Sequence, residues 1–348
     1  MQQGSSDKRP PVSVIILTWN ALPLLQRYLP SVAASSYDNL EIILADNASS
    51  DGSADWVSQS FPEVRIIRHQ ENYGFCRGNN LAIAEAQGDY VVLLNNDVEV
   101  DRDWLQPLVA QMLSDDRVAA VQPKILKSGE PLSFEYAGAA GGFIDRWGFP
   151  FARGRLFETI EKDEGQYDVA ADIFWATGAA VMLRATVLKD VGLLDEQFFM
   201  HMEEIDLCWR MKRRGHRIVC EPASAVYHLG GASLPSSSSR KAYYNFRNNL
   251  LTLYKNVSPS HWRRVIIVRI LLDTVAAMRA VGLGRADEAR AIWRAHRDAA
   301  RMRERYKADR PTTESGVEVY GGSVVIDYFL RGRRKFMDLP SSTFSATR

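Results

Sequence analysis

Three apolar runs in this sequence end in polar side chains suited to binding a phosphorylated ligand. An apolar run without alternation, such as Val91 to Leu94, is typical of a strand that is covered on both faces. In sheets built from such strands, ligands bind beyond the carboxyl ends. The polar groups are Thr18 with Asn20, Asp46 with Asn47, and Asn95 with Asn96 and Asp97. Their order predicts a single site at one edge of a sheet.

The residue types in these groups favour a nucleotide diphosphate. Asp46 can accept hydrogen bonds from a base or a ribose. Asp97 is a hard oxygen ligand, suited to Mg²⁺ or Mn²⁺ that also binds phosphate oxygens. Between them a helix begins, and a helix N-terminus favours anions. This stretch contains Gly74, Arg77, Gly78 and Asn80.

Each of these groups also has a plainer interpretation. Residues 47–53 alone are typical of a turn followed by a helix cap, and residues 95–97 alone are typical of a turn. Their joint occurrence in this order is what favours a site. No G-x-G-x-x-G motif follows the first strand and no Walker sequence is present. A nucleotide would therefore be bound through neither glycine motif.

The elements expected to position these groups alternate along the first hundred residues. Strands are expected at 12–19, 40–46, 64–69 and 90–97, with helices at 21–34, 54–60 and 72–86. This order predicts an α/β fold with a parallel sheet between helices.

The rest of the chain is less regular. Residues 118–170 are rich in glycine and aromatic residues, which indicates mobile loops over a site. A strand at 179–184, a helix that begins at Glu203 and stops at Gly215, and short strands at 217–220 and 224–231 are expected next. Helices are expected beyond a serine run at 236–239.

Seven motifs in succession resemble those of glycosyltransferase family 2, with the GT-A fold. They are SVIILTWN, ADNASSDGS, NYGFCRGNN, YVVLLNNDVEV, TGAAVMLR, GLLDEQFFMHMEEIDLCWR and VYHLGG. The resemblance spans roughly residues 11 to 255 and is strongest to the branch of rhamnosyltransferases and galactofuranosyltransferases. It implies a nucleotide-diphospho-sugar transferase fold, with a mixed, mostly parallel sheet between helices and a helical C-terminal extension.

The resemblance also implies a metal site. Asn96 and Asp97 would belong to a metal-binding D-x-D motif that is written here Asn95-Asn96-Asp97, so Asp97 alone supplies negative charge. His228, in VYHLGG, matches a further metal ligand of this branch, whereas a strand histidine taken alone is more often structural. The implied cofactor is Mg²⁺ or Mn²⁺.

An acidic pair carries the catalytic expectation. The resemblance makes Glu204 the general base and places Glu203 against acceptor hydroxyls. The alternative is that both carboxylates simply favour the first turn of a helix. We expect Asp206 to be structural, either capping the helix or pairing with Arg210 one turn on. Trp175 would form an apolar platform for an acceptor sugar, or else be a buried core residue.

The implied reaction is an inverting, metal-dependent glycosyl transfer. The sugar would come from a nucleotide-diphosphate sugar, dTDP-rhamnose or a UDP-sugar, and pass to a hydroxyl of a cell-surface polysaccharide or a lipid-linked glycan. A nucleotidyltransferase would need a glycine-rich, arginine-containing loop after the first strand, and LTWNALPLL has neither feature. A non-catalytic nucleotide- or glycan-binding module is the other alternative, favoured by the missing acidic residue before Asp97.

Composition excludes several classes of protein. The chain has 348 residues, 46% hydrophobic, with a net charge of +1, and we expect no nucleic-acid partner. Cys76, Cys208 and Cys220 are too few and too scattered for a disulfide framework or a zinc knuckle. The first residues lack the apolar core of a signal peptide, and charges interrupt the longest apolar stretch, 265–281. We therefore expect a cytoplasmic protein, peripheral on the inner face of the membrane.

The C-terminal region is basic, with 13 Lys and Arg against 6 Asp and Glu between residues 261 and 310. A helix at 264–282 has a broad apolar face. The next, at 286–309, has a thin apolar stripe of Ala289, Ile292, Trp293, His296 and Ala300. These helices are expected to pack on the catalytic domain, form a homo-oligomer or lie on an anionic membrane surface. The expected division is a disordered 1–10, a catalytic domain at 11–235, a basic helical region at 236–310 and a partly ordered tail at 311–348.

Overall fold

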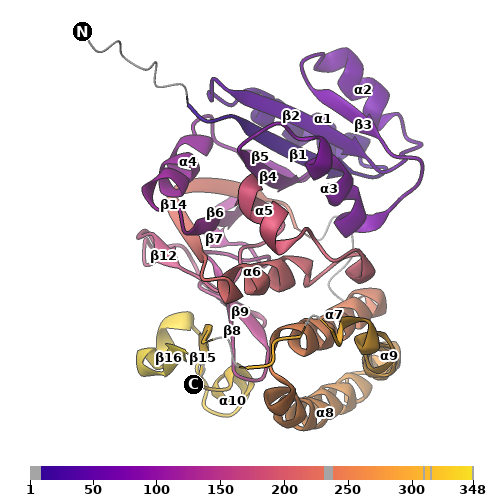
Figure 1. The fold of residues 1–348 in the computed structure, drawn as a ribbon, viewed down its shortest axis with the longest axis vertical. Helices are drawn as coiled ribbons and strands as arrows, with labels where there is room; N and C mark the ends of the chain where they lie inside the picture. The colour runs from indigo at the N-terminus through magenta and orange to yellow at the C-terminus, as the bar shows by residue number, and fades with distance from the viewer. Residues whose placement is uncertain (1–8, 231–237, 309, 314–315, 347–348) are drawn as a thin grey trace.

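A ten-stranded mixed sheet forms the centre of the computed structural model, which describes residues 9–230, 238–308, 310–313 and 316–346 (Figure 1). Four of its strands, all within residues 12–95, run parallel in the order β4-β1-β2-β3. They are β1 (Val12–Thr18), β2 (Leu40–Asp46), β3 (Arg65–Arg68) and β4 (Tyr90–Asn95). The parallel sheet expected from the alternating pattern is confirmed for this half.

The other half of the sheet is mixed. β13 runs antiparallel to both of its neighbours, β4 and β6, while β14 runs parallel to β6. β14 is one strand with a register shift between Glu221 and Ala225, where two short strands were expected. The bounds are β5 (Val98–Val100), β6 (Val118–Lys127), β7 (Glu130–Phe134), β12 (Ala171–Asp172), β13 (Ala180–Arg184) and β14 (Arg217–His228).

Helices cover both faces of the sheet, because successive residues of a strand point to opposite sides. On β1, Val14 and Ile16 pack in one hydrophobic cluster and Ile15 packs in the other. The helices of the first cluster are α1 (Leu22–Ala33), α2 (Ser53–Ser60) and α4 (Leu105–Ser114). Those of the second are α3 (Gly74–Glu85), α5 (Ala185–Val191) and α6 (Glu203–Arg213).

About half of residues 118–170 is β-structure, so the expectation of loops is wrong for those parts and holds for the connections between them. After β6 and β7 comes a small antiparallel sheet of β8 (Gly142–Ile144), β9 (Pro150–Ala152), β10 (Arg155–Leu156) and β11 (Thr159–Ile160). Strands of two or three residues are too short to show an alternating pattern. Close packing stabilises this sheet: the Trp175 ring occupies the space where a Cβ of Gly142 would lie, 2.0 Å from that position.

Three C-terminal helices lie below the sheet in the view of Figure 1: α7 (Ser239–Asn256), α8 (Pro259–Gly282) and α9 (Ala286–Met302). Hydrogen bonds from α7 join these helices to the segment before α6. Its Asn248 Nδ2 donates hydrogen bonds to the carbonyls of Phe198, Met200 and His201, at 3.1, 2.9 and 2.8 Å. The helical layer therefore fixes the backbone from which α6 begins.

The two outer helices differ in what they expose. α9 buries Ala289 and Ile292 of the expected stripe and leaves Trp293 half exposed. α8 instead exposes apolar side chains at helical spacing: Ile267, Leu271, Val275 and Met278. No helix in the described ranges is long and apolar enough to cross a membrane.

The tail after Pro311 contains a two-stranded sheet, β15 (Glu318–Tyr320) with β16 (Phe344–Ala346), and the helix α10 (Val324–Phe329). Ser323 caps the start of α10, its Oγ accepting from the Ile326 amide at 3.4 Å. The buried Asp327 accepts a hydrogen bond from the Tyr320 hydroxyl at 2.6 Å. The expected domain boundary at 235 and residues 1–8 of the expected disordered N-terminus lie outside the described residues.

Candidate active site

The predicted polar strand ends meet at the carboxyl edge of the parallel strands. Thr18 stands in register with Asp46 on the neighbouring strand. The Asn47 amide donates to the Thr18 carbonyl at 2.9 Å, and Asn96 Nδ2 donates to the Thr18 hydroxyl at 3.1 Å. The ends of β1, β2 and β4 are thus joined by hydrogen bonds between the residues that the sequence singled out.

The loops after β1 and β2 hold one another in place. Asn20, in a left-handed conformation with φ of 48°, accepts a hydrogen bond from the Ser50 amide at 2.7 Å through its side chain. Its own amide donates to the Ser49 hydroxyl at 2.9 Å, and Asp46 Oδ1 accepts from the Ser49 amide at 3.1 Å. The exposed Asn20 therefore supports the loop that follows the buried Asp46.

The start of α3 binds another part of the chain. The amides of Phe75 and Cys76 donate to the Phe199 carbonyl at 2.8 and 3.2 Å, and the Phe199 ring occupies the space where a Cβ of Gly74 would lie. A diphosphate would have to compete with Phe199 for these amides. Arg77 is exposed, with its guanidinium 4.0 Å from the Tyr73 ring centroid.

Two asparagines behind this helix start are buried. Asn80 exchanges two hydrogen bonds with the backbone of Leu194, at 2.8 and 3.1 Å, so its amide fixes the chain that leads to Phe199. Asn47 Nδ2 donates to the Gly74 carbonyl at 3.1 Å, while its Oδ1 is buried without a hydrogen-bond partner. A Cβ at Gly78 would lie 2.9 Å from that oxygen, which explains the glycine.

Asp97 and His228 are brought together by strand pairing. β14 runs antiparallel to β5, with His228 opposite Val98, the residue after Asp97. His228 Nε2 lies 3.0 Å from Asp97 Oδ1, and His228 Nδ1 lies 3.1 Å from the Glu135 carboxylate. Burial lowers the pKa of His228, but the two neighbouring carboxylates outweigh this and raise it to about 10.

The chemistry of this group fits a divalent cation that is shared with a ligand. Adjacent ligands of an octahedral ion with bonds of about 2.1 Å lie about 3.0 Å apart, which is the separation of Asp97 Oδ1 and His228 Nε2. A carboxylate behind a histidine, as Glu135 is here, is the usual support for a metal-binding imidazole. Among the described residues no three His, Cys, Asp or Glu side chains are grouped as a metal site, so phosphate and water oxygens would have to complete the coordination.

The two carboxylates expected to act on the acceptor begin α6, after a strained turn. Phe199, His201 and Met202 all have positive φ, between 65° and 71°, which costs non-glycine residues about 1–3 kcal/mol each. The hydrogen bonds from α7 hold this turn in place. As a result Glu203 and Glu204 enter the site from the first turn of a helix whose direction is fixed.

Both carboxyls are held in low-dielectric surroundings. Burial raises the pKa of Glu203 well above its usual range, and the neighbouring Glu204 raises it further. Burial likewise raises the pKa of Glu204, to about 7, against the backbone hydrogen bonds that lower it. One oxygen of each carboxyl, Oε2, is buried without a hydrogen-bond partner. A carboxyl with these properties suits proton transfer near neutral pH.

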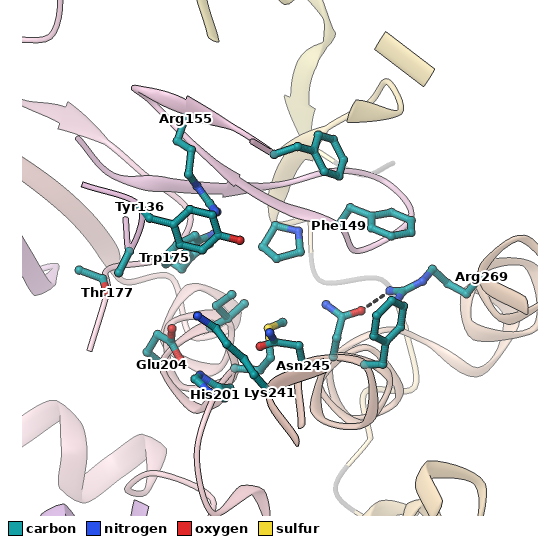
Figure 2. Close-up of a pocket in the computed structure, with 17 residues that line it drawn as sticks. Tyr136, Phe149, Arg155, Trp175, Thr177, His201, Glu204, Lys241, Asn245 and Arg269 are labelled. Carbon is teal, nitrogen blue, oxygen red and sulfur yellow. Dashed lines mark hydrogen bonds between the residues drawn. The ribbon is translucent and has the colours of Figure 1, made fainter. Parts of the chain in front are cut away.

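Glu204 lies where two cavities meet. A cavity of about 200 Å³ is lined by Asp97, His228, Glu203 and Glu204 among others. A second, of about 320 Å³, is shown in Figure 2 and contains Trp175. The residues lining both are Tyr136, Ala137, Thr177, His201, Glu204 and Lys241. Glu204 thus borders the cavity that contains Asp97 and His228 and also the cavity that contains Trp175.

Trp175 fits both of the interpretations that its sequence position allowed. It is buried, and its indole Nε1 donates to the Phe143 carbonyl at 2.9 Å, which fixes the ring. It also lines the larger cavity, close to Thr177 (Figure 2). Asp206 pairs with Arg210 at 2.9 Å, as expected, and also with Lys255 of α7 at 2.8 Å.

Four residues of the site were not found from the sequence: Glu135, Tyr136, Arg155 and Lys241. Three of them belong to the region expected to be loops, and no motif marks any of them. Asn80, by contrast, lines neither of the two cavities. The other residues predicted to bind the nucleotide also lie outside these cavities, at the adjoining edge of the sheet: Thr18, Asn20, Asp46, Asn47, Gly74, Arg77 and Asn96.

Comparison with known proteins identifies the family. A family model described as glycosyl transferase family 2 matches residues 13–191, half of the chain. The chain belongs to glycosyltransferase family 2. This glycosyltransferase is 27% identical over 229 residues to the N-acetylglucosaminyl-diphospho-decaprenol L-rhamnosyltransferase of Mycobacterium tuberculosis, a match that covers 62% of this chain and 75% of the relative.

Solved structures show the same GT-A fold in other proteins. GalNAc-T7, solved with UDP, GalNAc and Mn²⁺, matches with a TM-score of 0.55 at 17% identity, over 74% of the glycosyltransferase and 49% of its own chain. TarS 1–349 of S. aureus, solved with UDP-GlcNAc, matches with a TM-score of 0.55 at 16% identity, over 86% and 84%. At these identities the likeness establishes the fold alone.

Proposed function

We propose that this glycosyltransferase transfers a sugar from a nucleotide-diphosphate sugar to an acceptor hydroxyl, with inversion at the anomeric carbon and with Glu204 as general base. The observation that carries the proposal is the position of Glu204 at the junction of the two cavities. An acceptor in the larger cavity and a sugar donor in the smaller one would meet at this carboxylate.

Proton removal is the step that Glu204 supplies. Its raised pKa makes the carboxylate a stronger base than an exposed glutamate, and a positioned base contributes about 10²- to 10⁴-fold to the rate. Burial and the neighbouring Glu204 raise the pKa of Glu203 well above its usual range, which favours its protonated form, and in that form it can donate a hydrogen bond to an acceptor oxygen. The unpaired buried oxygens of both carboxyls leave these positions free for a substrate.

The leaving group is a nucleoside diphosphate, whose developing negative charge must be stabilised. Asp97 and His228 would hold Mn²⁺ or Mg²⁺, which acts as a Lewis acid on the diphosphate of the donor when bound. The imidazole favours Mn²⁺, because Mg²⁺ takes oxygen ligands almost exclusively. The nucleotide is proposed to bind at the adjoining carboxyl edge of the sheet, to Thr18, Asp46, Asn47, Asn96 and the exposed Asn20 and Arg77.

Inversion is proposed because the base and the leaving group would act on opposite faces of the anomeric carbon. A single displacement then needs no enzyme nucleophile. The donor is proposed to be dTDP-rhamnose or a UDP-sugar, since a relative is named as a rhamnosyltransferase and two structures of this fold contain UDP or UDP-GlcNAc.

The acceptor is proposed to be a polysaccharide or a lipid-linked glycan, because that same relative is named for a diphospho-decaprenol sugar. The exposed apolar face of α8 supports a peripheral position on the cytoplasmic leaflet. Arg263, Arg264 and Arg279 stand exposed on the same helix, so anionic lipids would complement its charge.

Calorimetry with a donor panel tests the proposal. dTDP-rhamnose, UDP-GlcNAc, UDP-galactose and UDP-galactofuranose are titrated with and without Mn²⁺ into the wild type and Asp97→Ala. Metal-dependent binding of one donor that is lost in Asp97→Ala supports the proposal and names the sugar. If a donor binds but neither transfer nor slow donor hydrolysis occurs, the protein is a binding module instead.

A further inference from the structure

The larger cavity contains two cations that form no ion pair with any described residue. Arg155, from β10, is only 9% exposed, and its Nε is buried without a hydrogen-bond partner. Its guanidinium carbon lies 3.7 Å from the centroid of the Tyr136 ring, and Lys241 Nζ lies 5.4 Å from the same centroid. Figure 2 shows both side chains reaching the cavity, from opposite sides of Tyr136 in that view.

The third cation of the cavity is already neutralised. Arg269 forms a buried ion pair with Asp273 at 3.3 Å, and it also donates to the Asn249 side chain. Glu204 is the acidic residue among the described lining of the cavity, and it enters from α6, away from β10 in Figure 2. In the view of Figure 2 Lys241 lies on the side of Glu204, and Arg155 lies across Tyr136 on the side away from that carboxyl. Neither cation has an ion-pair partner among the described residues.

An unpaired buried cation is costly, and stacking on one aromatic ring offsets only part of that cost. The planar fork of an arginine matches two oxygens of a phosphate, and a lysine adds a second point charge. A bound phosphate would therefore satisfy the groups that the protein leaves unsatisfied. Lys241 lines both cavities, whereas Arg155 lines the larger cavity and not the smaller one that contains Asp97. Arg155 is therefore the cation that distinguishes this anion from the diphosphate of the sugar donor.

We propose that Arg155 and Lys241 bind a phosphate or diphosphate group of the acceptor, so that the substrate class is a phosphorylated glycan and not a neutral one. The inference rests on the proposed function, since it assumes that the acceptor lies in this cavity. The anion fixes one end of the acceptor sugar, and the other end presents its hydroxyl to Glu204. Tyr136 positions the two cations through its ring.

The test is calorimetric titration of inorganic pyrophosphate in the presence of EDTA, where metal-dependent donor binding is suppressed. The wild type is expected to bind one pyrophosphate. Arg155→Gln and Lys241→Gln are each expected to weaken this binding by about 10- to 100-fold, the value of one charged hydrogen bond. Lys189→Gln, which removes an exposed cation from α5, should leave it within about twofold.

Two results would overturn the inference: wild type that binds no pyrophosphate, or binding that is equally strong in both glutamine variants. If Arg155→Gln unfolds, Lys241→Gln decides, because Lys241 is partly exposed on the surface of α7. Donor affinity measured with Mn²⁺ separates this inference from the proposed function. A loss of donor affinity in Arg155→Gln as large as the loss of pyrophosphate affinity would assign these cations to the sugar donor and reject the acceptor subsite.

Discussion

His228 Nε2 lies 3.0 Å from Asp97 Oδ1, although Asp97 belongs to the fourth of the seven motifs and His228 to the last. The pairing of β14 with β5 determines this distance, because it places His228 beside the residue that follows Asp97. On its other nitrogen the imidazole faces Glu135, at 3.1 Å. All three side chains are buried and line the smaller cavity, and Glu135 faces the nitrogen of the imidazole that is turned away from Asp97.

Glu135→Gln should therefore weaken metal binding without removing a ligand. A carboxylate behind a metal-binding histidine orients the ring and increases its basicity, and losing one typically costs about 10- to 100-fold in metal affinity. The measurement is Mn²⁺ affinity by calorimetry or electron paramagnetic resonance in the presence of UDP. Glu130→Gln, at an exposed position on β7, is the matched control and should bind Mn²⁺ like the wild type. Equal affinity in Glu135→Gln would exclude His228 as a ligand.

Replacing the proposed base should separate catalysis from binding. Glu204→Gln keeps the size of the side chain but cannot accept a proton, so kcat is expected to fall by about 10²- to 10⁴-fold. Donor affinity should stay within about threefold, because the proposed diphosphate site lies with Asp97 and His228. Glu203→Gln should mainly raise KM for the acceptor. A larger loss of kcat in Glu203→Gln than in Glu204→Gln would show that Glu203 is the general base and that Glu204 binds the acceptor.

The pH dependence of the reaction should report the raised pKa of Glu204. The base must be ionised to act, so kcat/KM for the acceptor should rise about tenfold per pH unit below a pKa of about 7 and level off above it. With an exposed glutamate as the base, kcat/KM would level off at about pH 4.3 instead. Donor affinity measured over the same range provides the control. A profile that is flat between pH 5 and 8 would contradict the assignment.

The same burial should make Glu203 destabilising at neutral pH. Its pKa is raised in the folded state, so the folded state binds more protons than the unfolded state, and the free energy of unfolding falls as pH rises above the usual glutamate pKa. Glu203→Gln removes this penalty. Its Tm should match the wild type near pH 4 and exceed it at pH 8 by about 2 °C or more. A Tm below that of the wild type at pH 8 would show that the Glu203 carboxylate makes favourable contacts when ionised.

The sequence predicted the parts of the site that depend on regular structure. Thr18, Asp46 and Asn96 end strands whose apolar runs are long enough to recognise, and parallel strands bring their ends together. Arg155 could not be predicted, since β10 has two residues and carries no periodicity. Nor could the contact of Phe199 with the start of α3, because it depends on a left-handed turn in non-glycine residues.

The exposed face of α8 makes membrane association testable apart from catalysis. Ile267, Leu271, Val275 and Met278 recur at helical spacing and are all exposed, so they would insert together at a lipid interface. Leu271→Glu combined with Met278→Glu should reduce co-sedimentation with phosphatidylglycerol vesicles at least about tenfold, since it removes buried apolar area and adds charge repelled by the lipid. Leu132→Glu, at an equally exposed position on β7, is the control and should bind vesicles like the wild type. If the double variant and the wild type sediment alike, α8 does not contact lipid. Its apolar face would then be expected to pack against a second copy of the chain.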